Sequence, residues 1–330
     1  MNTPAVSVVI SVKNRSSMLL DCFRGLAAQT LPKERFEVVV LDNCSSEDLG
    51  PVFEQARALG LELRTMRTTE DRGPAPARNQ GVRLARGEFI AFTDSDCRPV
   101  PRWLEAALEA FNAVDVAMVS GPVLGKPEQT AGFTSKLSFA VATEHPTFPT
   151  ANLLIRRDVF NSMDGFNEAL CFRDPLNRAT ECADTDLAWR IIKKPYQRRF
   201  VPEAVVYHEL EEQGLMMWML EPTRLFCLPE LVRRHPELRR SLLTGGVLFY
   251  PPGLLLYLGL LLAAAIAWFQ PLLLALVPLL LVLRAIYRTR SLHPGVLLRF
   301  CARAPLHALK LLVMNLSLLY GSVRFRSLVL

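Results

Sequence analysis

Two aspartates, Asp94 and Asp96, stand one residue apart directly after an apolar run at residues 88–92. The run has the length and composition of a buried strand. Carboxylates at the end of such a strand can hold a hard divalent cation that also binds the oxygens of a diphosphate. A D-x-D pattern by itself is also typical of a turn or a helix cap. Its meaning therefore depends on which other polar residues reach the same place.

Other polar residues follow apolar runs in the same way. Asp42 and Asn43 come after a predicted strand at residues 37–41, and His208 comes after one at residues 200–207. An imidazole there can be a metal ligand or an ordinary strand-end histidine. Since ligands of open α/β sheets lie at the carboxyl ends of the strands, these residues are candidates for one shared site.

The elements that must position these residues alternate along the chain. Apolar runs of strand length are separated by segments whose apolar residues have helical spacing. The predicted strands are residues 5–10, 37–41, 61–66, 88–92, 116–119 and 200–207, and the predicted helices are residues 16–28, 48–59, 75–85, 102–112 and 183–193. Between residues 119 and 183 we predict a largely irregular stretch. This alternation predicts an α/β domain with a mostly parallel, doubly wound sheet, which is Rossmann-like.

Six blocks of the sequence, in order across residues 5–210, resemble the family 2 glycosyltransferases. The blocks are SVVISVKNR at 7–15, VVVLDNCSSED at 38–48, ARNQGVRLARGEFIAFTDSD at 77–96, NLLIRRDVFNSMDGFNE at 152–168, ADTDLAWRI at 183–191 and VPEAVVYHE at 201–209. The block that ends in the D-x-D pattern is the most specific. The resemblance implies a GT-A fold, an inverting mechanism, and a UDP-sugar, GDP-sugar or dTDP-sugar as donor.

The resemblance also implies roles for individual residues. The candidates for binding the nucleotide-sugar are Ser11, Asn14, Asp42, Arg78, Asp94 and Ser95. Asp42 would accept hydrogen bonds from the base, and Asp94 would lie near the ribose or the metal. Asp96 and His208 would bind Mg²⁺ or Mn²⁺, which offsets the charge on the departing diphosphate. Arg78 could add to this stabilisation or could form a surface ion pair.

Asp184 is the candidate catalytic base, because an inverting transfer needs a carboxylate that takes the proton of the acceptor hydroxyl. It occupies the second position of the family's acidic pair, whereas Ala183 stands where the family usually has Glu. Glu181 is near the missing acid but out of register. Asp184 and Asp186 could alternatively cap the helix that follows them.

Two departures from the family pattern bear on function. Ser11, Val12 and Lys13 stand where the family is usually written Pro-Thr-Tyr, and Ala183 replaces a Glu. The second departure supports an alternative, a catalytically impaired transferase-like domain that serves as a membrane scaffold or binding module. A nucleotidyltransferase would need a Gly-rich loop after the first strand, and residues 11–17 contain no glycine.

Charge divides the chain in two. Residues 231–330 hold twelve Lys or Arg and one acid, Glu237, whereas the rest of the chain holds 26 basic and 31 acidic residues. The basic residues of the second part flank long apolar runs. This pattern favours contact with a membrane and argues against nucleic acid as a partner.

Two uncharged apolar runs, residues 252–269 and 271–283, predict a hairpin of two transmembrane helices. Arginines flank the pair on both sides, so the positive-inside rule places both ends in the cytosol. A buried helical hairpin is the alternative. The predicted organisation is a GT-A domain at 1–215, an amphipathic connector at 216–243, the hairpin at 244–290, and a basic amphipathic tail on the membrane surface at 291–330.

Seven scattered cysteines show no metal or disulfide spacing, and the N-terminus shows no secretory signal. We therefore expect reduced thiols and a catalytic domain that faces the cytosol at the cytoplasmic (inner) membrane. The expected acceptor is a lipid-linked sugar, a lipid or a growing surface polysaccharide. Processive synthases of the family carry a Q-x-x-R-W motif, which this sequence lacks, so the addition of a single sugar is expected.

Overall fold

The computed structural model of the protein describes residues 3–136, 140–269 and 276–330. Contacts among these residues divide them into two compact units. The first, which we call the sheet unit, comprises the chain up to Arg173 together with Asn177–Gln213. The second, the helical unit, comprises Asp174–Leu176 and Gly214–Leu330.

The sheet unit is built on a seven-stranded sheet with the strand order β12-β6-β9-β4-β1-β2-β3. Its strands are β1 (Val6–Val12), β2 (Phe36–Asp42), β3 (Leu63–Arg67), β4 (Phe89–Phe92), β6 (Val116–Ser120), β9 (Leu153–Arg156) and β12 (Gln197–Phe200). All neighbours pair parallel except β9, which runs antiparallel to β4 and β6. The sheet is therefore mostly parallel, as the alternating pattern predicted.

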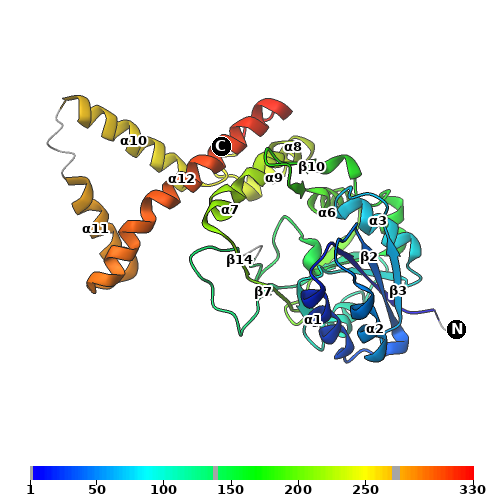
Figure 1. The fold of residues 1–330 in the computed structure, drawn as a ribbon. Helices are drawn as coiled ribbons and strands as arrows, with labels where there is room; N and C mark the ends of the chain where they lie inside the picture. The colour runs from blue at the N-terminus through cyan, green and yellow to red at the C-terminus, as the bar shows by residue number, and fades with distance from the viewer. Residues whose placement is uncertain (1–2, 137–139, 270–275) are drawn as a thin grey trace. The chain divides into compact units, whose positions relative to one another are not determined.

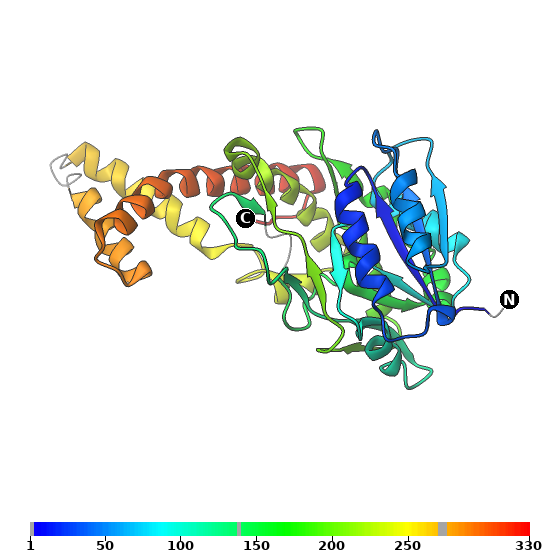
Figure 2. The same ribbon diagram turned by 60° about the horizontal axis from the view of Figure 1, so that its bottom comes forward.

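Helices cover both faces of this sheet. Among the described residues, the α-helices of the sheet unit are α1 (Ser16–Ala27), α2 (Gly50–Ala58), α3 (Pro74–Leu84), α4 (Trp103–Glu109), α5 (Arg157–Ser162) and α6 (Ala183–Ile192). Short 3₁₀ turns are Lys33–Arg35, Thr150–Asn152 and Glu168–Leu170. Helices α1 and α2 lie side by side on one face (Figures 1 and 2) and bury Phe23 and Leu26 with the strand residues Val8 and Ile10.

Helix α3 packs on β1 and β2 at Gly81. A Cβ atom at this glycine would lie 2.5 Å from a methyl group of Leu41 and 2.6 Å from one of Val9. Any larger residue would push the helix away from the sheet. The close packing fixes the position of Arg78, which lies on the same helix.

A smaller sheet with the order β5-β13-β7 stands at the carboxyl edge of β4, made of Cys97–Pro99, Val206–His208 and Val123–Gly125. The prediction of one strand at residues 200–207 was wrong. Strand β12 ends at Phe200 in the large sheet, and β13 begins at Val206 in the small one. Pro202 lies between them and lacks the N–H group that a central strand must donate.

The prediction of a largely irregular stretch between residues 119 and 183 was also wrong in part. It contains β9 and α5, and further along the hairpin of β10 (Cys171–Arg173) and β11 (Ala179–Glu181). A short pair joins β14 (Glu211–Glu212) to β8 (Ser135–Lys136). The apolar run of β9 is only three residues long, too short for its periodicity to be read.

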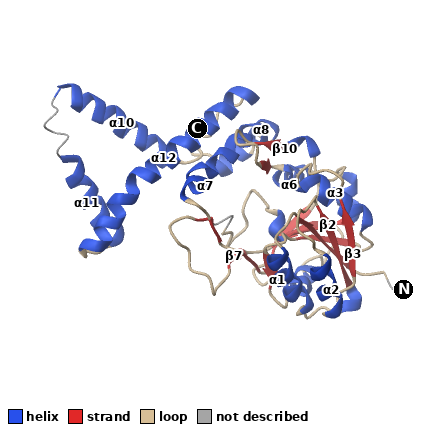
Figure 3. Cartoon of the chain, viewed as in Figure 1, coloured by secondary structure: helices blue, strands red, loops and turns tan. Residues whose placement is uncertain are grey.

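The helical unit consists of helices joined by loops (Figure 3). They are α7 (Leu215–Leu220), the 3₁₀ segment η4 (Glu221–Cys227), α8 (Leu228–Arg234), α9 (Leu238–Leu242), α10 (Pro251–Phe269), α11 (Leu276–Thr289) and α12 (Pro294–Phe325). The second half of α12 packs on η4 and α8. At the crossing, a Cβ atom on Gly321 would lie 2.0 Å from the carbonyl oxygen of Phe226, so only glycine allows it.

The predicted hairpin at 244–290 covers α10 and α11, while Gln270 and residues 271–275 lie outside the described residues. Within the described residues, α12 is the helix long and apolar enough to cross a membrane, with a mean hydropathy of 1.4. A third of its most apolar stretch is buried inside the protein, and buried core helices satisfy the same criterion. This helix lies in the segment predicted to be a basic tail on the membrane surface.

Candidate active site

Asp94 and Asp96 lie just beyond the carboxyl end of β4, and the small sheet brings further ligand atoms beside them. His208 of β13 pairs in register with Cys97 of β5. The backbone N–H of Glu209 donates to the carbonyl oxygen of Asp96 at 2.9 Å. As a result, one ligand atom each of Asp94, Asp96, Cys97 and His208 lies within 4.8 Å of the others. Residues far apart in the sequence thus form one cluster.

The ring of His208 has a defined orientation. Its Nδ1 lies 2.8 Å from the carbonyl oxygen of Glu209. Because a carbonyl oxygen only accepts hydrogen bonds, Nδ1 must carry a proton. Nε2 lies 3.5 Å from Oδ1 of Asp96. In the neutral ring Nε2 keeps its lone pair, which is the form that binds a metal.

Asp94, Asp96 and His208 fit a Mg²⁺ or Mn²⁺ ion. Burial raises the pKa of Asp96, and repulsion from Asp94 adds to the rise against the attraction of His208 and Arg15. Two carboxylates that repel each other, of which Asp96 is buried and Asp94 is partly exposed, favour a divalent cation between them. Cys97 fits less well, because burial and the two aspartates raise its pKa well above normal and the thiolate form that binds metals is disfavoured.

Arg15 lies beside the candidate metal site, and the sequence analysis did not assign it a role. Its guanidinium forms ion pairs with Asp96 and with Glu211. Arg15 and the preceding Asn14 both have positive φ angles, 66° and 61°, in the turn between β1 and α1. Periodicity does not reveal such a turn, and the only available signal was the position of Arg15 at the end of the first family-like block.

Arg78 is 5% exposed on α3 and joins two acids. Nη2 donates to Oδ1 of Asp94 at 2.8 Å, and Nη1 donates to Oε1 of Glu181 at 2.5 Å. Burial opposes the charge of Arg78, but Glu181, Asp94 and Asp184 outweigh it and raise the pKa of the guanidinium. The ion pairs of Arg78 are thus buried and do not lie at the surface. They hold a fixed positive charge beside the candidate metal site.

Asp184 lies in the first turn of α6, close to this bridge. Its Oδ1 accepts from the backbone N–H of Thr185 at 2.7 Å, and its carboxylate also accepts from the backbone N–H of Thr150. Burial and the charge of Glu181 raise the pKa of Asp184 to about 7, although these hydrogen bonds and Arg78 limit the rise. A carboxyl group with that pKa is suited to proton transfer near neutral pH.

The acids around Asp184 divide into two kinds. Asp186 accepts from Nε of Arg190 at 2.8 Å and is buried, so its partner is a neighbour on the same helix. Glu181 belongs to β11, and besides Arg78 it accepts from the backbone N–H of Ala75 at 3.0 Å. The acid beside Asp184 therefore comes from the strand that precedes α6, and not from position 183.

The remaining candidates for nucleotide-sugar binding lie at the ends of β1, β2 and β4. Asp42 is buried at the end of β2, where Oδ1 accepts from the backbone N–H of Ser45 at 2.8 Å. Ser11 is partly buried on β1. Ser95 is 5% exposed and stands between Asp94 and Asp96.

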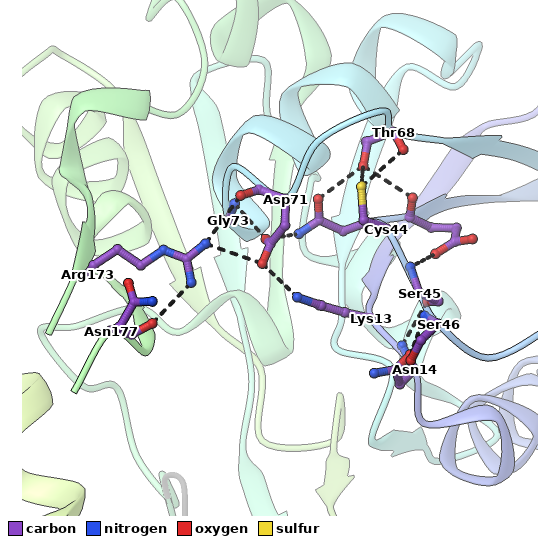
Figure 4. A network of polar contacts seen from close by, with 12 residues as sticks. Lys13, Asn14, Cys44, Ser45, Ser46, Thr68, Asp71, Gly73, Arg173 and Asn177 are labelled. Carbon is purple, nitrogen blue, oxygen red and sulfur yellow. Dashed lines mark hydrogen bonds and ion pairs between the residues drawn. The ribbon is translucent and has the colours of Figure 1, made fainter.

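Asn14 joins the ends of β1 and β2. Its side-chain oxygen accepts from the backbone N–H of Ser46 at 2.8 Å and from that of Glu47 at 3.2 Å. Its own backbone N–H donates to Oγ of Ser45 at 2.7 Å (Figure 4). Asn14 thus holds the loop after Asp42 in place. This structural role is independent of any contact between Asn14 and a ligand.

Residues 7–175, more than half of the chain, match the sequence profile of glycosyl transferase family 2. The chain belongs to this family. The match includes the ends of β1, β2 and β4, at which Ser11, Asn14, Asp42 and the two aspartates of the cluster lie.

Two relatives of this chain are named glycosyltransferases. Glycosyltransferase AglE of Haloferax volcanii is 29% identical over 170 residues, which cover 49% of this chain and 56% of that protein. The pre-mycofactocin glycosyltransferase of Mycobacterium tuberculosis is 28% identical over 260 residues, 73% of this chain and 50% of that protein. The chain therefore spans about half the length of either relative.

The fold is similar to those of two solved structures. The mannosyltransferase PcManGT from Pyrobaculum calidifontis, in complex with GDP-Man and Mn²⁺, has a TM-score of 0.58 at 21% identity, over 99% of this chain and 88% of that one. TarS 1–349 of S. aureus with UDP-GlcNAc has a TM-score of 0.51 at 19% identity, over 70% of this chain and 72% of that one. These likenesses concern the fold, and they confirm the predicted GT-A architecture.

Proposed function

We propose that the protein is an inverting glycosyltransferase that moves a single sugar from a nucleotide-diphosphate sugar to an acceptor hydroxyl at the cytosolic face of the membrane. The observation that supports this most is the cluster of Asp94, Asp96 and His208, which Arg78 connects to the surroundings of Asp184. Both relatives described above are named glycosyltransferases, and the structural neighbours bind GDP-Man or UDP-GlcNAc.

The donor in this proposal is a UDP-, GDP- or dTDP-sugar. Asp94, Asp96 and His208 would hold Mg²⁺ or Mn²⁺, which when bound would supply charge that stabilises the leaving diphosphate. Arg78 donates to Asp94 and orients its carboxylate. Arg15 holds Asp96 in the same way from the turn after β1.

Asp184 would act as the general base. The acceptor oxygen attacks the anomeric carbon on the face opposite the diphosphate, the bond from that carbon to the diphosphate oxygen breaks, and the hydroxyl proton passes to Asp184. Burial and Glu181 raise the proton affinity of Asp184, so it can hold this proton near neutral pH. Arg78 keeps the pKa from rising so far that the base would already be protonated.

The helical unit supports an acceptor at a membrane, in the synthesis of lipid-linked glycan or surface polysaccharide. Its helix α10 exposes large apolar side chains, each at least 62% accessible: Leu255, Leu261, Leu262, Trp268 and Phe269. Large exposed apolar patches are typical of surfaces that contact a membrane or another protein. A transferase held at the bilayer in this way would meet an acceptor that is itself anchored in lipid.

The proposal is tested by incubating the full-length protein with Mn²⁺ and a panel of nucleotide-sugars and measuring the release of free sugar. We expect slow hydrolysis of one donor, which Asp96→Ala abolishes. Thermal melting with Mn²⁺ and UDP or GDP gives an independent readout, since a ligand that binds the folded state raises the melting temperature. A protein that shows neither hydrolysis nor metal-dependent stabilisation would be the scaffold considered above.

A further inference from the structure

Helix α12, drawn in orange to red in Figure 1, carries a stripe of exposed apolar side chains that the proposed transfer reaction does not use. In the second half of the helix these side chains recur every three or four residues, and one more lies three turns earlier. They are Leu298, Leu309, Leu312, Leu316, Leu319 and Val323, each at least 36% accessible. They therefore lie on one face of α12, along about 38 Å of its length.

The opposite face of α12 packs on the rest of the helical unit. Met314, Leu318 and Gly321 are buried there, and Gly321 meets the backbone of Phe226. Because an α-helix has 3.6 residues per turn, Leu316 projects almost opposite to Leu318. The apolar stripe therefore faces away from the core of the helical unit and stays exposed among the described residues. An exposed apolar stripe of this length is typical of a surface that binds a membrane or another protein.

Basic residues form a second stripe on α12. Arg299, Arg303 and Lys310 are four and seven residues apart, so they lie on one face of the helix. Both arginines are exposed, and Nζ of Lys310 lies 3.9 Å from the centre of the Trp218 ring, a cation–π contact that fixes the ammonium group. Glu221 attracts Lys310, but α12 itself contains no acid, so the stripe keeps a net positive charge.

The positions of these charges argue against α12 crossing the bilayer, although its length and composition suffice. Its longest uncharged run is residues 311–323, about 20 Å of helix, whereas the hydrocarbon core is about 30 Å thick. Every segment of α12 with the roughly 20 residues needed to span includes Lys310. A spanning α12 would therefore hold a lysine within the membrane, where a charged side chain is costly.

A second copy of the chain is a poorer partner for the apolar stripe than a lipid surface. Residues 231–330 hold twelve basic residues and one acid, Glu237, so two copies paired through this part of the chain would repel each other. The phosphate groups of anionic lipids carry the complementary charge. An apolar stripe beside a basic one is also typical of helices that lie in the membrane surface.

We propose that α12 lies in the plane of the membrane surface, with its apolar stripe at the edge of the hydrocarbon and Arg299, Arg303 and Lys310 bound to the phosphate groups of anionic lipids. The inference rests on the proposed function, because it needs the protein to work at a membrane. The sequence predicted a basic tail at the membrane surface, but not which face of the helix meets the lipid or which residues bind the head groups.

Vesicle binding of the full-length protein tests the contact with head groups. The vesicles are made of phosphatidylcholine or of an equal mixture with phosphatidylglycerol. The wild type should bind the mixed vesicles about 10- to 100-fold more tightly than the neutral ones, a difference that high salt reduces. The triple variant Arg299→Gln, Arg303→Gln and Lys310→Gln should lose this difference and keep the binding to neutral vesicles that α10 supplies.

The matched control removes three positive charges from exposed residues of the sheet unit, by Arg24→Gln, Arg35→Gln and Lys194→Gln. It should bind both kinds of vesicle as the wild type does. Melting temperatures equal to that of the wild type would show that the fold persists in both triple variants. An α12 variant that keeps the preference for the mixed vesicles, or a control that loses it, would overturn the contact with head groups.

The depth of three residues tests the orientation of the helix. A fluorescent amino acid replaces Leu298, Leu309 or Leu319, and lipids with a nitroxide quencher near the head group or at the end of the acyl chain report its depth. A helix in the membrane surface puts all three positions at one shallow depth, about 5–10 Å into the boundary of head groups and acyl chains. Quenching at Leu309 that is strongest with the chain-end nitroxide would show that α12 crosses the bilayer, and would overturn the inference.

The outcomes separate this inference from the function on which it rests. A wild type that binds neither kind of vesicle overturns the membrane location in the proposed function, and the inference with it, whereas the hydrolysis assay tests sugar transfer separately. A wild type that binds both kinds equally overturns the inference alone. Dimers that form without lipid and that Leu316→Lys separates would assign the stripe to a second copy of the chain, which also overturns it.

Discussion

Arg78 and Asp94 form an ion pair of 2.8 Å in which the cation is buried and the carboxylate is partly exposed, with side-chain exposures of 6% and 30%. The same guanidinium binds Glu181, whose charge raises the pKa of Asp184. Arg78 therefore connects the acids of the candidate metal site with the candidate base. Its removal should affect both.

We predict that Arg78→Met shifts the acid limb of the pH profile of kcat/KM to higher pH. Without the guanidinium, the attraction that lowers the pKa of Asp184 is lost and the repulsion from Glu181 remains. Loss of one partner from a buried ion pair also costs about 3–5 kcal/mol of stability, which thermal melting would detect. Arg83→Met, an exposed change on the same helix, is the matched control. An unchanged profile in Arg78→Met would refute the coupling.

Asp184→Asn should lower kcat by roughly 10²- to 10⁴-fold, the loss expected when a general base is removed. Nucleotide binding should stay within about twofold of the wild type, because Asn preserves the size of the side chain. In the wild type, activity should rise as pH increases through about 7, where Asp184 loses its proton. Steady-state kinetics across pH 5–9 checks both points, with the exposed Asp158→Asn as control. Equal losses in binding and turnover would make Asp184 a structural residue.

Asp184→Asn should also make the folded protein more stable than the wild type, but only at pH values above the pKa of an unperturbed aspartate. The pKa of Asp184 is about 7 in the folded state, and an unperturbed Asp has a pKa of about 4. Between these values the folded state holds more protons than the unfolded state, so the wild type loses stability as pH rises. The melting temperatures of the two proteins should coincide near pH 4 and differ fully above pH 7. A constant difference across this range would mean that another mechanism is at work.

The sequence indicated that the candidate metal ligands lie close together in the fold, because each of them follows an apolar strand. Asp94, Asp96 and His208 are all found by that rule, although the strand before His208 is shorter than predicted. Arg15 and Lys13 were not assigned roles, since their partners Asp96 and Asp71 lie 81 and 58 residues away. Ion pairs across such separations leave no periodic signal.

Local sequence patterns also failed to predict contacts that depend on the rest of the fold. Glu181 was out of register with the family pattern, yet strand β11 brings it to Arg78. The interleaved apolar and basic residues of α12 predicted a segment on a membrane surface. They do not reveal that Gly321 allows the helix to pack closely on Phe226.

His208→Asn should weaken the apparent affinity for Mn²⁺ about 10- to 100-fold, whereas Asp96→Ala should abolish metal-dependent stabilisation by nucleotide. In the proposed site His208 would contribute a neutral ligand, and Asp96 would contribute charge as well as a ligand atom. Melting curves over a Mn²⁺ titration at fixed UDP or GDP measure both effects. His145→Asn, at a histidine outside the cluster, is the control. Wild-type metal dependence in His208→Asn would remove His208 from the site.

The double variant Leu261→Lys and Leu262→Lys should release the protein from lipid vesicles. Both side chains are exposed on α10, at 68% and 62%. A lysine in the interior of a bilayer costs about 2.5–3.5 kcal/mol, so two should cost enough to reverse binding by a short apolar helix. Val114→Lys, a change at a still more exposed residue in the sheet unit, should float with vesicles as the wild type does. Nucleotide-dependent stabilisation should persist in every variant, which separates loss of membrane contact from loss of fold. A double variant that still floats would mean that α10 is not the surface that meets the lipid.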